Sequence, residues 1–402
     1  MSEIVVVGAG QAGAALVARL RGAGFDGGIT LIGEEPVPPY QRPPLSKAYL
    51  LGDMPLERLF LRPESYYAEQ DIRLLTDSRV SAIDPAAKTV ALDSGSIGYD
   101  QLALTTGSVP RMLPESAGGL LGGVYPVRTL ADVDAMAPKF LKGASALVVG
   151  GGYIGLEAAA AAAKRGLDVT VVEVADRILQ RVAARETSSY IRNLHRAHGV
   201  DIRERIGIQR LVGNTSVEFA ELSDGSRIRA DLVVIGVGIV PNTELAAAAG
   251  LEIDNGIKTD ALGRTSVPGI WAAGDCTSFP YRGDRIRLES VQNAIDQAET
   301  VAVNMLGHET PYDPTPWFWS DQYDLKLQIA GLNTGHTEIV SRISDDGSRA
   351  SYWYFGKNRL LAVDAMNDPI SYMVGRRLIE AGKTPNRETI SDPKSNLKAL
   401  LR

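Results

Sequence analysis

The sequence predicts an α/β fold with two similarly built halves and a smaller α+β domain at the C-terminal end, and three observations predict it. A glycine-rich turn joins an apolar strand to a helix at residues 8–13, and a turn of the same kind follows at residues 150–155. Each helix leads to a second apolar strand with a glutamate at or just beyond its end. Beyond residue 315, aromatic residues and short strands replace this pattern. The two halves are therefore predicted to be Rossmann-like dinucleotide-binding domains.

The first glycine-rich turn follows the apolar strand at residues 4–7 and contains Gly8, Gly10 and Gly13. In a dinucleotide-binding turn, such glycines form the bend, let the backbone approach a pyrophosphate and allow the helix to pack closely. The helix N-terminus then faces the phosphates. Glu34 lies just beyond the next strand, near the offset of about 20 residues at which an acidic residue binds ribose hydroxyls.

The second turn repeats this arrangement after the apolar strand at residues 146–149, and the strand after its helix is followed by Glu173. One isolated match is weak, because glycines also occur in ordinary turns, but here both turns have the strand, the helix and the acid in place. Two adjacent dinucleotide sites favour electron transfer between their cofactors, because nicotinamide delivers a hydride that a flavin accepts. The alternative is a pair of α/β units that bind no ligand.

Length and charge limit the classes of protein to which the chain can belong. With 402 residues it exceeds the size at which single cores stop growing, so two or three domains are expected. Its 42 basic and 48 acidic residues give a net charge of −6, which does not favour nucleic-acid binding. No apolar run approaches the length that crosses a bilayer, and the first residues do not resemble an export signal. We therefore expect a cytoplasmic protein that binds neither nucleic acid nor membranes.

Cys276 is the only cysteine, which excludes an intramolecular disulfide and favours a reducing compartment. It also excludes a relay of electrons through two thiols, which many flavoenzymes with two dinucleotide sites use. The expected role of Cys276 is that of a small buried residue after a strand, with a reactive thiol as the alternative. Electrons are therefore expected to leave a flavin directly, to oxygen, a quinone or another protein.

The remaining segments predict further strands and one long helix. Residues 80–84 and 89–92 predict a hairpin, and residues 291–306 predict a helix. Strands that run into a glycine are predicted at 102–107, 232–238 and 269–274. Such glycines would lie at the carboxyl ends of parallel strands, where open α/β folds bind ligands.

Aromatic residues characterise the C-terminal segment, which contains three of the four tryptophans. Trp353 and Phe355 are expected to be core residues. Trp317 and Trp319 lie between polar flanks, so they are expected either in the core or as a cover for a cofactor. Strands are predicted in this segment at 326–330, 351–355 and 360–364.

Five motifs together resemble those of one family. They are residues 43–50 (PPLSKAYL), 150–157 (GGGYIGLE), 274–276 (GDC), 289–294 (ESVQNA) and 316–322 (PWFWSDQ). At these motifs, and over its whole length, the chain resembles the FAD-dependent ferredoxin reductases of oxygenase systems. The domains implied by the resemblance are an FAD-binding domain at 1–107 and 242–314, an NADH-binding domain at 108–241 and a C-terminal reductase domain at 315–402.

The resemblance also implies which residues hold the cofactors. FAD contacts are implied for Gly8, Gly10, Ala12, Gly13, Glu34, Pro44, Lys47, Val80, Arg128, Asp275, Val291 and Trp319. NADH contacts are implied for Gly150, Gly152, Tyr153, Ile154, Gly155, Glu173 and Gly238. No metal site is expected, because His195 and His198 share a helix face but have neither a cysteine nor a dense set of carboxylates beside them.

Lys47, Glu157 and Trp319 are the residues implied to act in electron transfer. A lysine beside the reactive edge of the flavin stabilises negative charge that arrives with a hydride, and Glu157 would hold this lysine in place. A purely structural ion pair is the alternative. Trp319 would pack beside the flavin ring and offer a short exit toward a docked iron-sulfur protein. Glu173 would favour NADH, because a 2′-phosphate would meet its carboxylate as a like charge.

The function implied is that of an NADH:ferredoxin oxidoreductase. Electrons would pass from NADH through FAD to a [2Fe-2S] ferredoxin, which serves a cytochrome P450 or a ring-hydroxylating dioxygenase. A monomer or a weak homodimer is expected. Two alternatives are a rubredoxin reductase and an NADH oxidase that acts on quinones or oxygen. A third, from another class, is a redox-sensing flavoprotein of the apoptosis-inducing type, in which slow reduction matters more than turnover.

Overall fold

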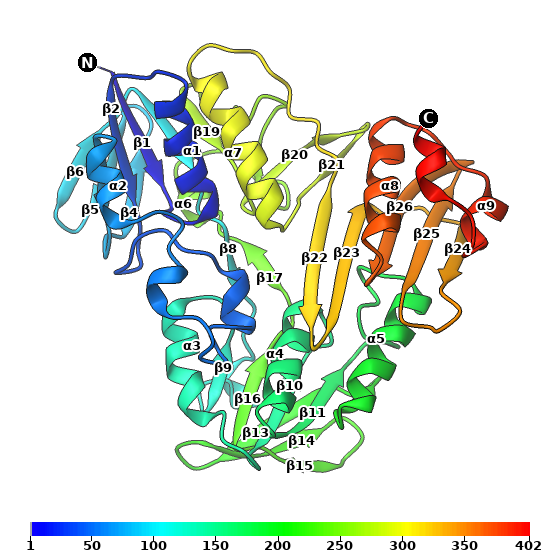
Figure 1. The fold of residues 1–402 in the computed structure, drawn as a ribbon. Helices are drawn as coiled ribbons and strands as arrows, with labels where there is room; N and C mark the ends of the chain where they lie inside the picture. Colours follow the sequence, from blue (N-terminus) through cyan, green and yellow to red (C-terminus); the bar gives the residue numbers. More distant parts are fainter. Residues whose placement is uncertain (1) are drawn as a thin grey trace. The chain divides into compact units, whose positions relative to one another are not determined.

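The computed structural model describes residues 2–402, and the contacts within the chain divide it into two compact units. The first unit comprises the chain up to Gln41 together with residues 55–109 and 239–314. The second unit comprises residues 42–54, 110–238 and 315–402. Figure 1 shows the helices and strands of both units, coloured along the chain. Each unit contains one five-stranded parallel sheet.

The sheet of the first unit has the strand order β19-β7-β1-β2-β3, and all its pairs are parallel. Helices α1 (Gln11–Gly22) and α7 (Val291–Met305) pack against each other beside this sheet (Figure 1). Its strands are β1 (Glu3–Val7), β2 (Gly28–Ile32), β3 (Ile72–Leu75), β7 (Gln101–Leu104) and β19 (Ile270–Ala272).

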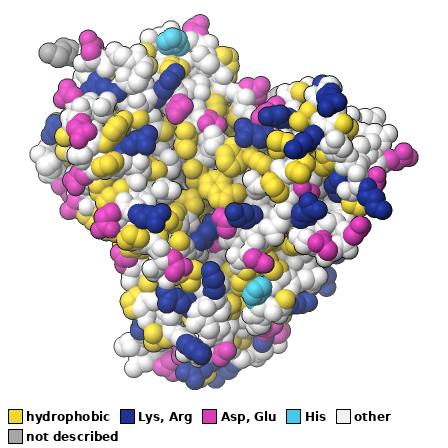
Figure 2. All heavy atoms as spheres, viewed as in Figure 1, with side chains coloured by type: hydrophobic (Ala, Val, Ile, Leu, Met, Phe, Trp, Pro, Cys, Tyr) yellow, Lys and Arg dark blue, Asp and Glu magenta, His cyan; other side chains and the backbone are white. Residues whose placement is uncertain are grey.

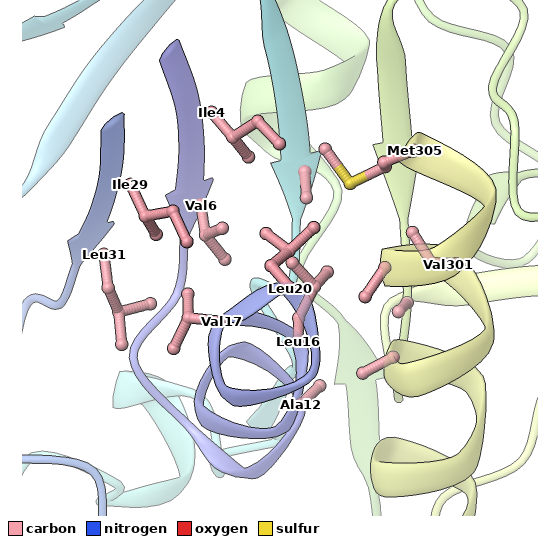
Figure 3. Close-up of a cluster of buried hydrophobic side chains, with 14 of the residues drawn as sticks. Ile4, Val6, Ala12, Leu16, Val17, Leu20, Ile29, Leu31, Val301 and Met305 are labelled. Atoms are coloured by element: carbon pink, nitrogen blue, oxygen red, sulfur yellow. The ribbon is translucent and has the colours of Figure 1, made fainter. Parts of the chain in front are cut away.

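Both faces of this sheet are covered, which explains the unbroken apolar run of β1. Ile4 and Val6 point to one face, where they pack with Leu16 of α1 and with residues of α7 (Figure 3). Val5 and Val7 point to the other face and join a second cluster. Successive residues of a strand alternate between faces, so one short segment contributes to both cores.

The second cluster of the first unit includes residues of an antiparallel sheet, β4-β5-β6. This sheet confirms the hairpin predicted at residues 80–84 and 89–92. The other elements of the unit are short, apart from α7, which confirms the predicted long helix. Their bounds are η2 (Leu56–Arg58), α2 (Glu64–Glu69), β4 (Val80–Asp84), β5 (Thr89–Leu92), β6 (Gly95–Gly98), β8 (Ser108–Pro110), β17 (Ile239–Pro241), α6 (Glu244–Ala248), β18 (Ile257–Lys258), β20 (Thr277–Tyr281) and β21 (Asp284–Ile286).

The parallel sheet of the second unit has the order β12-β11-β10-β16-β9. Helix α4 (Tyr153–Lys164) packs on β10 and β11, and its run of buried alanines allows a close approach. The strands are β9 (Val124–Pro126), β10 (Ser145–Val149), β11 (Asp168–Glu173), β12 (Asp201–Glu204) and β16 (Leu232–Ile235). Further elements of this part are η1 (Pro43–Ser46), η3 (Glu115–Ala117), α3 (Leu130–Met136), η4 (Ala137–Lys139), α5 (Arg185–Ala197), β13 (Ile208–Gly213), β14 (Val217–Leu222) and β15 (Arg227–Arg229).

The C-terminal part of the second unit is an antiparallel sheet in the order β22-β23-β26-β25-β24, which confirms the three strands predicted there. Trp353 and Phe355 are at most 1% exposed in its core, as expected. Helix α8 packs on β23 and β26. The bounds are β22 (Trp317–Gln322), β23 (Leu325–Gly331), β24 (Glu338–Ile343), β25 (Ala350–Gly356), β26 (Arg359–Met366), α8 (Pro369–Glu380), α9 (Arg387–Ser391) and η5 (Leu397–Leu401).

Over the span from residue 2 to residue 402, no helix combines the length and the apolar character needed to cross a bilayer.

Asp364 of β26 is a buried carboxyl group, only 1% exposed. Its Oδ2 accepts hydrogen bonds from the hydroxyls of Thr187, at 2.6 Å, and Tyr354. Its Oδ1 has no hydrogen-bond partner within residues 2–402. Burial raises the pKa of Asp364 from 3.8 to about 6, although both hydrogen bonds oppose this shift. The folded protein therefore retains a proton on Asp364 at pH values where the unfolded chain has lost it.

We expect the free energy of unfolding to fall as pH rises from about 4 through about 6. In this range the unfolded chain has already lost the Asp364 proton and the folded protein still binds it, so rising pH favours the unfolded state. The shift of about two pKa units bounds this loss at about 3 kcal/mol. Urea unfolding of the wild type and of Asp364→Asn between pH 4 and pH 8 measures it, because only the wild type titrates at this position. The stability of the asparagine variant relative to the wild type should rise with pH. A constant difference would show that Asp364 does not titrate in this window.

Candidate functional site

The glycines of the first turn are of two kinds. A Cβ atom on Gly8, whose φ is +114°, would lie 2.2 Å from the carbonyl oxygen of Thr105. A Cβ atom on Gly13 would lie 2.1 Å from the carbonyl oxygen of Gly8. A Cβ atom on Gly10, by contrast, would meet no atom within 4 Å. The fold therefore requires glycine at positions 8 and 13, whereas Gly10 borders open space that the chain itself does not fill.

The second turn shows the same division. Gly150 has a φ of +106°, and its Cβ atom would lie 2.4 Å from the carbonyl oxygen of Gly236. A Cβ atom on Gly155 would lie 2.2 Å from the carbonyl oxygen of Gly150. The nearest atom to a Cβ on Gly152 would be 3.9 Å away. The two turns thus share their packing as well as their spacing, although they lie in different units.

Both open glycines are helix N-caps. Gly10 precedes α1 and Gly152 precedes α4, and neither helix has a side-chain cap. The first N–H groups of each helix have no intrahelical acceptor, and the helix dipole adds partial positive charge there. A pyrophosphate satisfies both features, and it needs the close approach that only a missing Cβ allows. The residues present therefore fit one dinucleotide at each turn.

Glu173 is held against the second turn by two backbone groups. Its Oε2 accepts a hydrogen bond from the N–H of Gly151 at 2.7 Å, and its Oε1 accepts one from the N–H of Ala175 at 2.8 Å. Each carboxylate oxygen keeps lone-pair capacity for a ribose hydroxyl. Arg177, the nearest basic residue in sequence, donates instead to the carbonyl oxygen of Ala184 at 3.3 Å.

Four implied FAD contacts lie in the first unit outside the turn. The side chain of Glu34 is 66% exposed, and its Oε1 lies 3.5 Å from the guanidinium of Arg79. Asp275 lies in the turn between β19 and β20, and its Oδ2 accepts a hydrogen bond from the Ser108 hydroxyl at 3.1 Å. Val80 is buried, at 5% exposure. Val291 is the first residue of α7, as expected.

The remaining implied contacts of the second unit differ in exposure. The ring of Tyr153 packs 4.9 Å from that of Phe318, and its buried hydroxyl has no hydrogen-bond partner within residues 2–402. Burial raises the pKa of Tyr153 well above its ordinary value. Ile154 is 44% exposed, and Arg128 is half-buried. A Cβ atom on Gly238 would meet nothing within 4 Å, but its φ of +99° favours glycine.

Lys47 and Glu157 form an ion pair inside the second unit. Lys47 directly follows η1, and Glu157 projects from α4; Nζ and Oε2 are 2.8 Å apart. The hydroxyl of Ser46 donates to the same Oε2 at 2.6 Å, and the hydroxyl of Ser320 donates to Oε1 at 2.7 Å. The side chain of Glu157 is 2% exposed and that of Lys47 is 20% exposed. The structure thus brings together the two residues that the resemblance pairs.

Burial raises the pKa of Glu157, while Lys47 and the two serine hydroxyls lower it. Three donors around one carboxylate stabilise its ionised form, in which the group accepts every hydrogen bond offered to it. We therefore assign the ionised form to Glu157. A buried ion pair by itself is weak evidence of a stabilising role, because the desolvation of both charges offsets their attraction.

Trp317 and Trp319 lie on the face of β22 opposite Ser320, since side chains of a strand alternate. Their ring centroids are 5.5 Å apart, and the guanidinium of Arg376 lies over the Trp317 ring. Trp319 is half-buried, and so is Pro44 in η1. Neither tryptophan is a fully buried core residue.

Cys276 is buried, as expected, and its Sγ lies 3.4 Å from the carbonyl oxygen of Ala273. Burial raises the pKa of the Cys276 thiol, which disfavours the reactive thiolate. Within residues 2–402, no three metal-ligating side chains gather into a site. His195 instead contacts Gln322, with Nε2 at 2.7 Å from Oε1.

Residues 2–298 match the family model of the pyridine nucleotide-disulphide oxidoreductases. The chain belongs to this family. Residues 317–401 match a second model, the reductase C-terminal domain, which includes β22 and therefore Ser320 and Trp319. As a pyridine nucleotide-disulphide oxidoreductase, the chain is an enzyme of oxidation and reduction, which agrees with its two dinucleotide-binding turns.

Similar proteins cover the chain from end to end. It is 43% identical over 403 residues to rhodocoxin reductase of Rhodococcus erythropolis. The aligned region covers 99% of this chain and 94% of that relative. Putidaredoxin reductase, in its covalent complex with putidaredoxin, is 39% identical with a TM-score of 0.96, and 100% and 98% of the two chains are covered. The ferredoxin reductase for the CYP199A2 system of Rhodopseudomonas palustris is 38% identical with a TM-score of 0.97, and both chains are covered completely. These likenesses confirm the predicted fold and the resemblance to ferredoxin reductases.

Proposed function

We propose that this chain is an FAD-dependent NADH:ferredoxin oxidoreductase whose electron acceptor is a [2Fe-2S] ferredoxin that serves a cytochrome P450 or a ring-hydroxylating dioxygenase. The observation that carries the proposal is the pair of open positions at Gly10 and Gly152, each at an uncapped helix N-terminus. Two such positions support two dinucleotides in one chain. The likeness to reductases that act with ferredoxins supports the choice of acceptor.

The proposed binding residues follow the two turns. FAD would contact Gly8, Gly10, Ala12, Gly13, Glu34, Pro44, Lys47, Val80, Arg128, Asp275, Val291 and Trp319. NADH would contact Gly150, Gly152, Tyr153, Ile154, Gly155, Glu173 and Gly238. The proposed domains are the FAD-binding residues 1–107 and 242–314, the NADH-binding residues 108–241 and the C-terminal residues 315–402.

When bound, FAD supplies the chemistry that takes two electrons from NADH and releases them singly. Lys47 would place its ammonium group where negative charge develops during this transfer, and Glu157 would hold that ammonium group in position. The raised pKa of the buried Cys276 thiol supports a route without a thiol intermediate. Trp319 would supply an aromatic surface beside the flavin ring.

We expect Glu173→Ala to narrow the preference for NADH over NADPH. A 2′-phosphate about 4 Å from the carboxylate costs about 1 to 4 kcal/mol, which is about fivefold to nine-hundredfold in kcat/KM. The measurement is kcat/KM for both coenzymes. Glu173→Gln removes the charge at almost constant shape and should show most of the same effect. An unchanged preference in both variants would place Glu173 away from the ribose.

The acceptor is tested by steady-state rates with NADH and four candidates: a [2Fe-2S] ferredoxin, a rubredoxin, a quinone and oxygen. The proposal predicts that kcat/KM is highest for the ferredoxin by about tenfold or more, the effect of about 1.4 kcal/mol of specific docking. A higher value for rubredoxin, quinone or oxygen would replace the ferredoxin assignment with that acceptor.

The proposal also concerns the docking surface, the oligomeric state and the cellular location of the enzyme. Basic and acidic side chains are interspersed on the face shown in Figure 2, so charge on this face does not single out one docking surface. We propose a monomer or weak homodimer, which analytical ultracentrifugation measures. We also propose a cytoplasmic location, supported by the free, buried thiol of Cys276.

A further inference from the structure

A continuous chain of hydrogen bonds runs from Glu157 to the far end of α5 inside the second unit. The Ser320 hydroxyl lies 2.7 Å from Glu157 Oε1, and Gln322 Nε2 lies 3.1 Å from Ser320 Oγ. Gln322 Oε1 lies 2.7 Å from His195 Nε2, and the Tyr323 hydroxyl lies 3.2 Å from His195 Nδ1. Glu157, Ser320, Gln322 and His195 are each at most 3% exposed, so water does not compete for these bonds.

While Glu157 is ionised, the hydrogen bonds of this series can have only one donor-to-acceptor direction. Ser320 has a single hydrogen and donates it to the carboxylate, so its oxygen must accept from the amide nitrogen of Gln322. The amide oxygen of Gln322 then faces His195, which must carry its hydrogen on Nε2. His195 Nδ1 is left as an acceptor for the hydroxyl of Tyr323. Every donor in the chain therefore points toward Glu157.

His195 is suited to this role because it stays neutral. Burial lowers the pKa of His195 to about 4, which the hydrogen bond to Gln322 opposes and the nearby His198 reinforces. Near pH 7 the ring therefore has one hydrogen and one lone pair, as the chain requires. Burial raises the pKa of Tyr323, so its hydroxyl keeps the hydrogen that it donates. The charged or titratable groups that face the chain are Lys47 at one end and His198 and Tyr323 at the other.

The register of β22 positions Ser320 and Gln322, the two residues in the middle of this series of hydrogen bonds. Phe318, Ser320 and Gln322 share one face of this strand, because side chains at i and i+2 point the same way. That face meets α4, on which Phe318 contacts Tyr153 and Ser320 contacts Glu157. Gln322 continues the row to α5. Three separate elements thus meet in one buried polar row.

We propose that Gln322 and His195 are positioning residues that keep the carboxylate of Glu157 ionised and directed at Lys47. The inference rests on the proposed function, in which Lys47 and Glu157 act beside the flavin. A proton on Glu157 Oε1 would meet the hydrogen of Ser320. It could be accommodated only if Ser320, Gln322 and His195 all reversed their hydrogen bonds, so this row of hydrogen bonds opposes protonation of Glu157 at Oε1. At Oε2, a proton would meet the donors of Lys47 and Ser46.

The test uses His195→Leu and Gln322→Leu, prepared as FAD-bound enzyme and compared with His195→Gln. We measure flavin reduction by NADH against pH, and separately the pH at which the spectrum of the oxidised flavin changes. Each leucine variant should slow reduction at pH 7 about five- to tenfold, the effect of losing one hydrogen bond. Both pH transitions should move to higher pH, because the pKa of Glu157 rises when its donors are lost. His195→Gln, which restores an N–H donor, should recover most of both effects.

Two controls separate positioning from general damage. His308→Leu removes an exposed histidine of the first unit, outside this row of hydrogen bonds, so it should leave the rate and both transitions unchanged. In a Glu157→Gln background, Gln322→Leu should have no further effect, because its only route to the flavin runs through Glu157.

The inference is overturned if both leucine variants keep the wild-type rate and transitions, or if Gln322→Leu slows Glu157→Gln as much as it slows the wild type. If His195→Leu does not fold, Gln322→Met and Ser320→Ala apply the same criteria at other points of the chain. If NADH does not reduce the flavin of the wild-type enzyme, that result would instead contradict the proposed function. A normally reduced wild type with unaffected variants would contradict the positioning role alone.

Discussion

The Gly10→Val protein is expected to fold like the wild type and to lose most of its FAD. A Cβ atom at this position meets no protein atom within 4 Å, and the backbone there is extended, so valine causes no strain in the fold. The side chain would instead fill the space that a pyrophosphate needs. Overpacking of a tight contact costs about 1 to 3 kcal/mol, which weakens binding about five- to 150-fold. Flavin released on denaturation measures the loss, and thermal unfolding reports on the fold.

Two variants accompany this one. Gly22→Val places the same side chain into open space at the exposed end of α1, away from the turn, and should keep the wild-type flavin content. Gly8→Ala should instead lower stability, because its φ is +114° and its Cβ would lie 2.2 Å from the Thr105 carbonyl oxygen. A Gly10→Val protein with full flavin content would remove the first turn from the FAD site.

The Gly152→Val protein is expected to keep its FAD and to need a much higher NADH concentration for reduction of the flavin. The nearest atom to a Cβ at this position is 3.9 Å away, so the fold should tolerate valine while the coenzyme pyrophosphate is excluded. The expected effect is again about five- to 150-fold, and it should appear as a higher NADH concentration for half-maximal reduction. Rapid mixing of the FAD-bound variant with NADH measures it. Dithionite, which needs no nucleotide site, should still reduce the flavin.

A graded series makes this result specific. Gly152→Ala adds a smaller group at the same point and should show a smaller increase in the NADH concentration required. Gly150→Ala should destabilise the protein, because its Cβ would lie 2.4 Å from the Gly236 carbonyl oxygen. Wild-type reduction of Gly152→Val at low NADH would show that the second turn does not bind this coenzyme.

The two turns could be predicted from the sequence because their conformation depends mainly on residues close together in the sequence. Gly8 and Gly150 adopt positive φ values that glycine allows, and Gly13 and Gly155 each pack against a carbonyl oxygen five residues earlier in the chain. Spacing alone therefore indicates the strand, the turn and the helix together. The alternation of apolar residues likewise predicted the hairpin and the C-terminal strands, whose order in the sheet it did not predict.

The surroundings of Glu157 could not be predicted, because they depend on contacts between distant segments. Ser46 and Ser320 lie 111 and 163 positions from Glu157 in sequence. Their contacts depend on the face of α4 that carries Glu157 and on the register of β22. In the sequence, His195 stands out only as a possible metal ligand beside His198. In the structure it is buried and contacts Gln322, which gives it a different role. The polar row at 320 and 322 was the available signal, since polar residues at i and i+2 of a strand share a face.

The central claim is that a bound flavin takes electrons from NADH without a thiol intermediate, and anaerobic rapid mixing of the purified protein with NADH tests it most directly. We expect a yellow protein whose flavin absorbance falls at about 1 to 1000 per second, the usual range for enzymes. Alkylation of Cys276 after denaturation should recover the same free thiol before and after reduction. The claim is contradicted by a protein that stays colourless after incubation with excess FAD, or by a flavin that dithionite reduces and NADH does not.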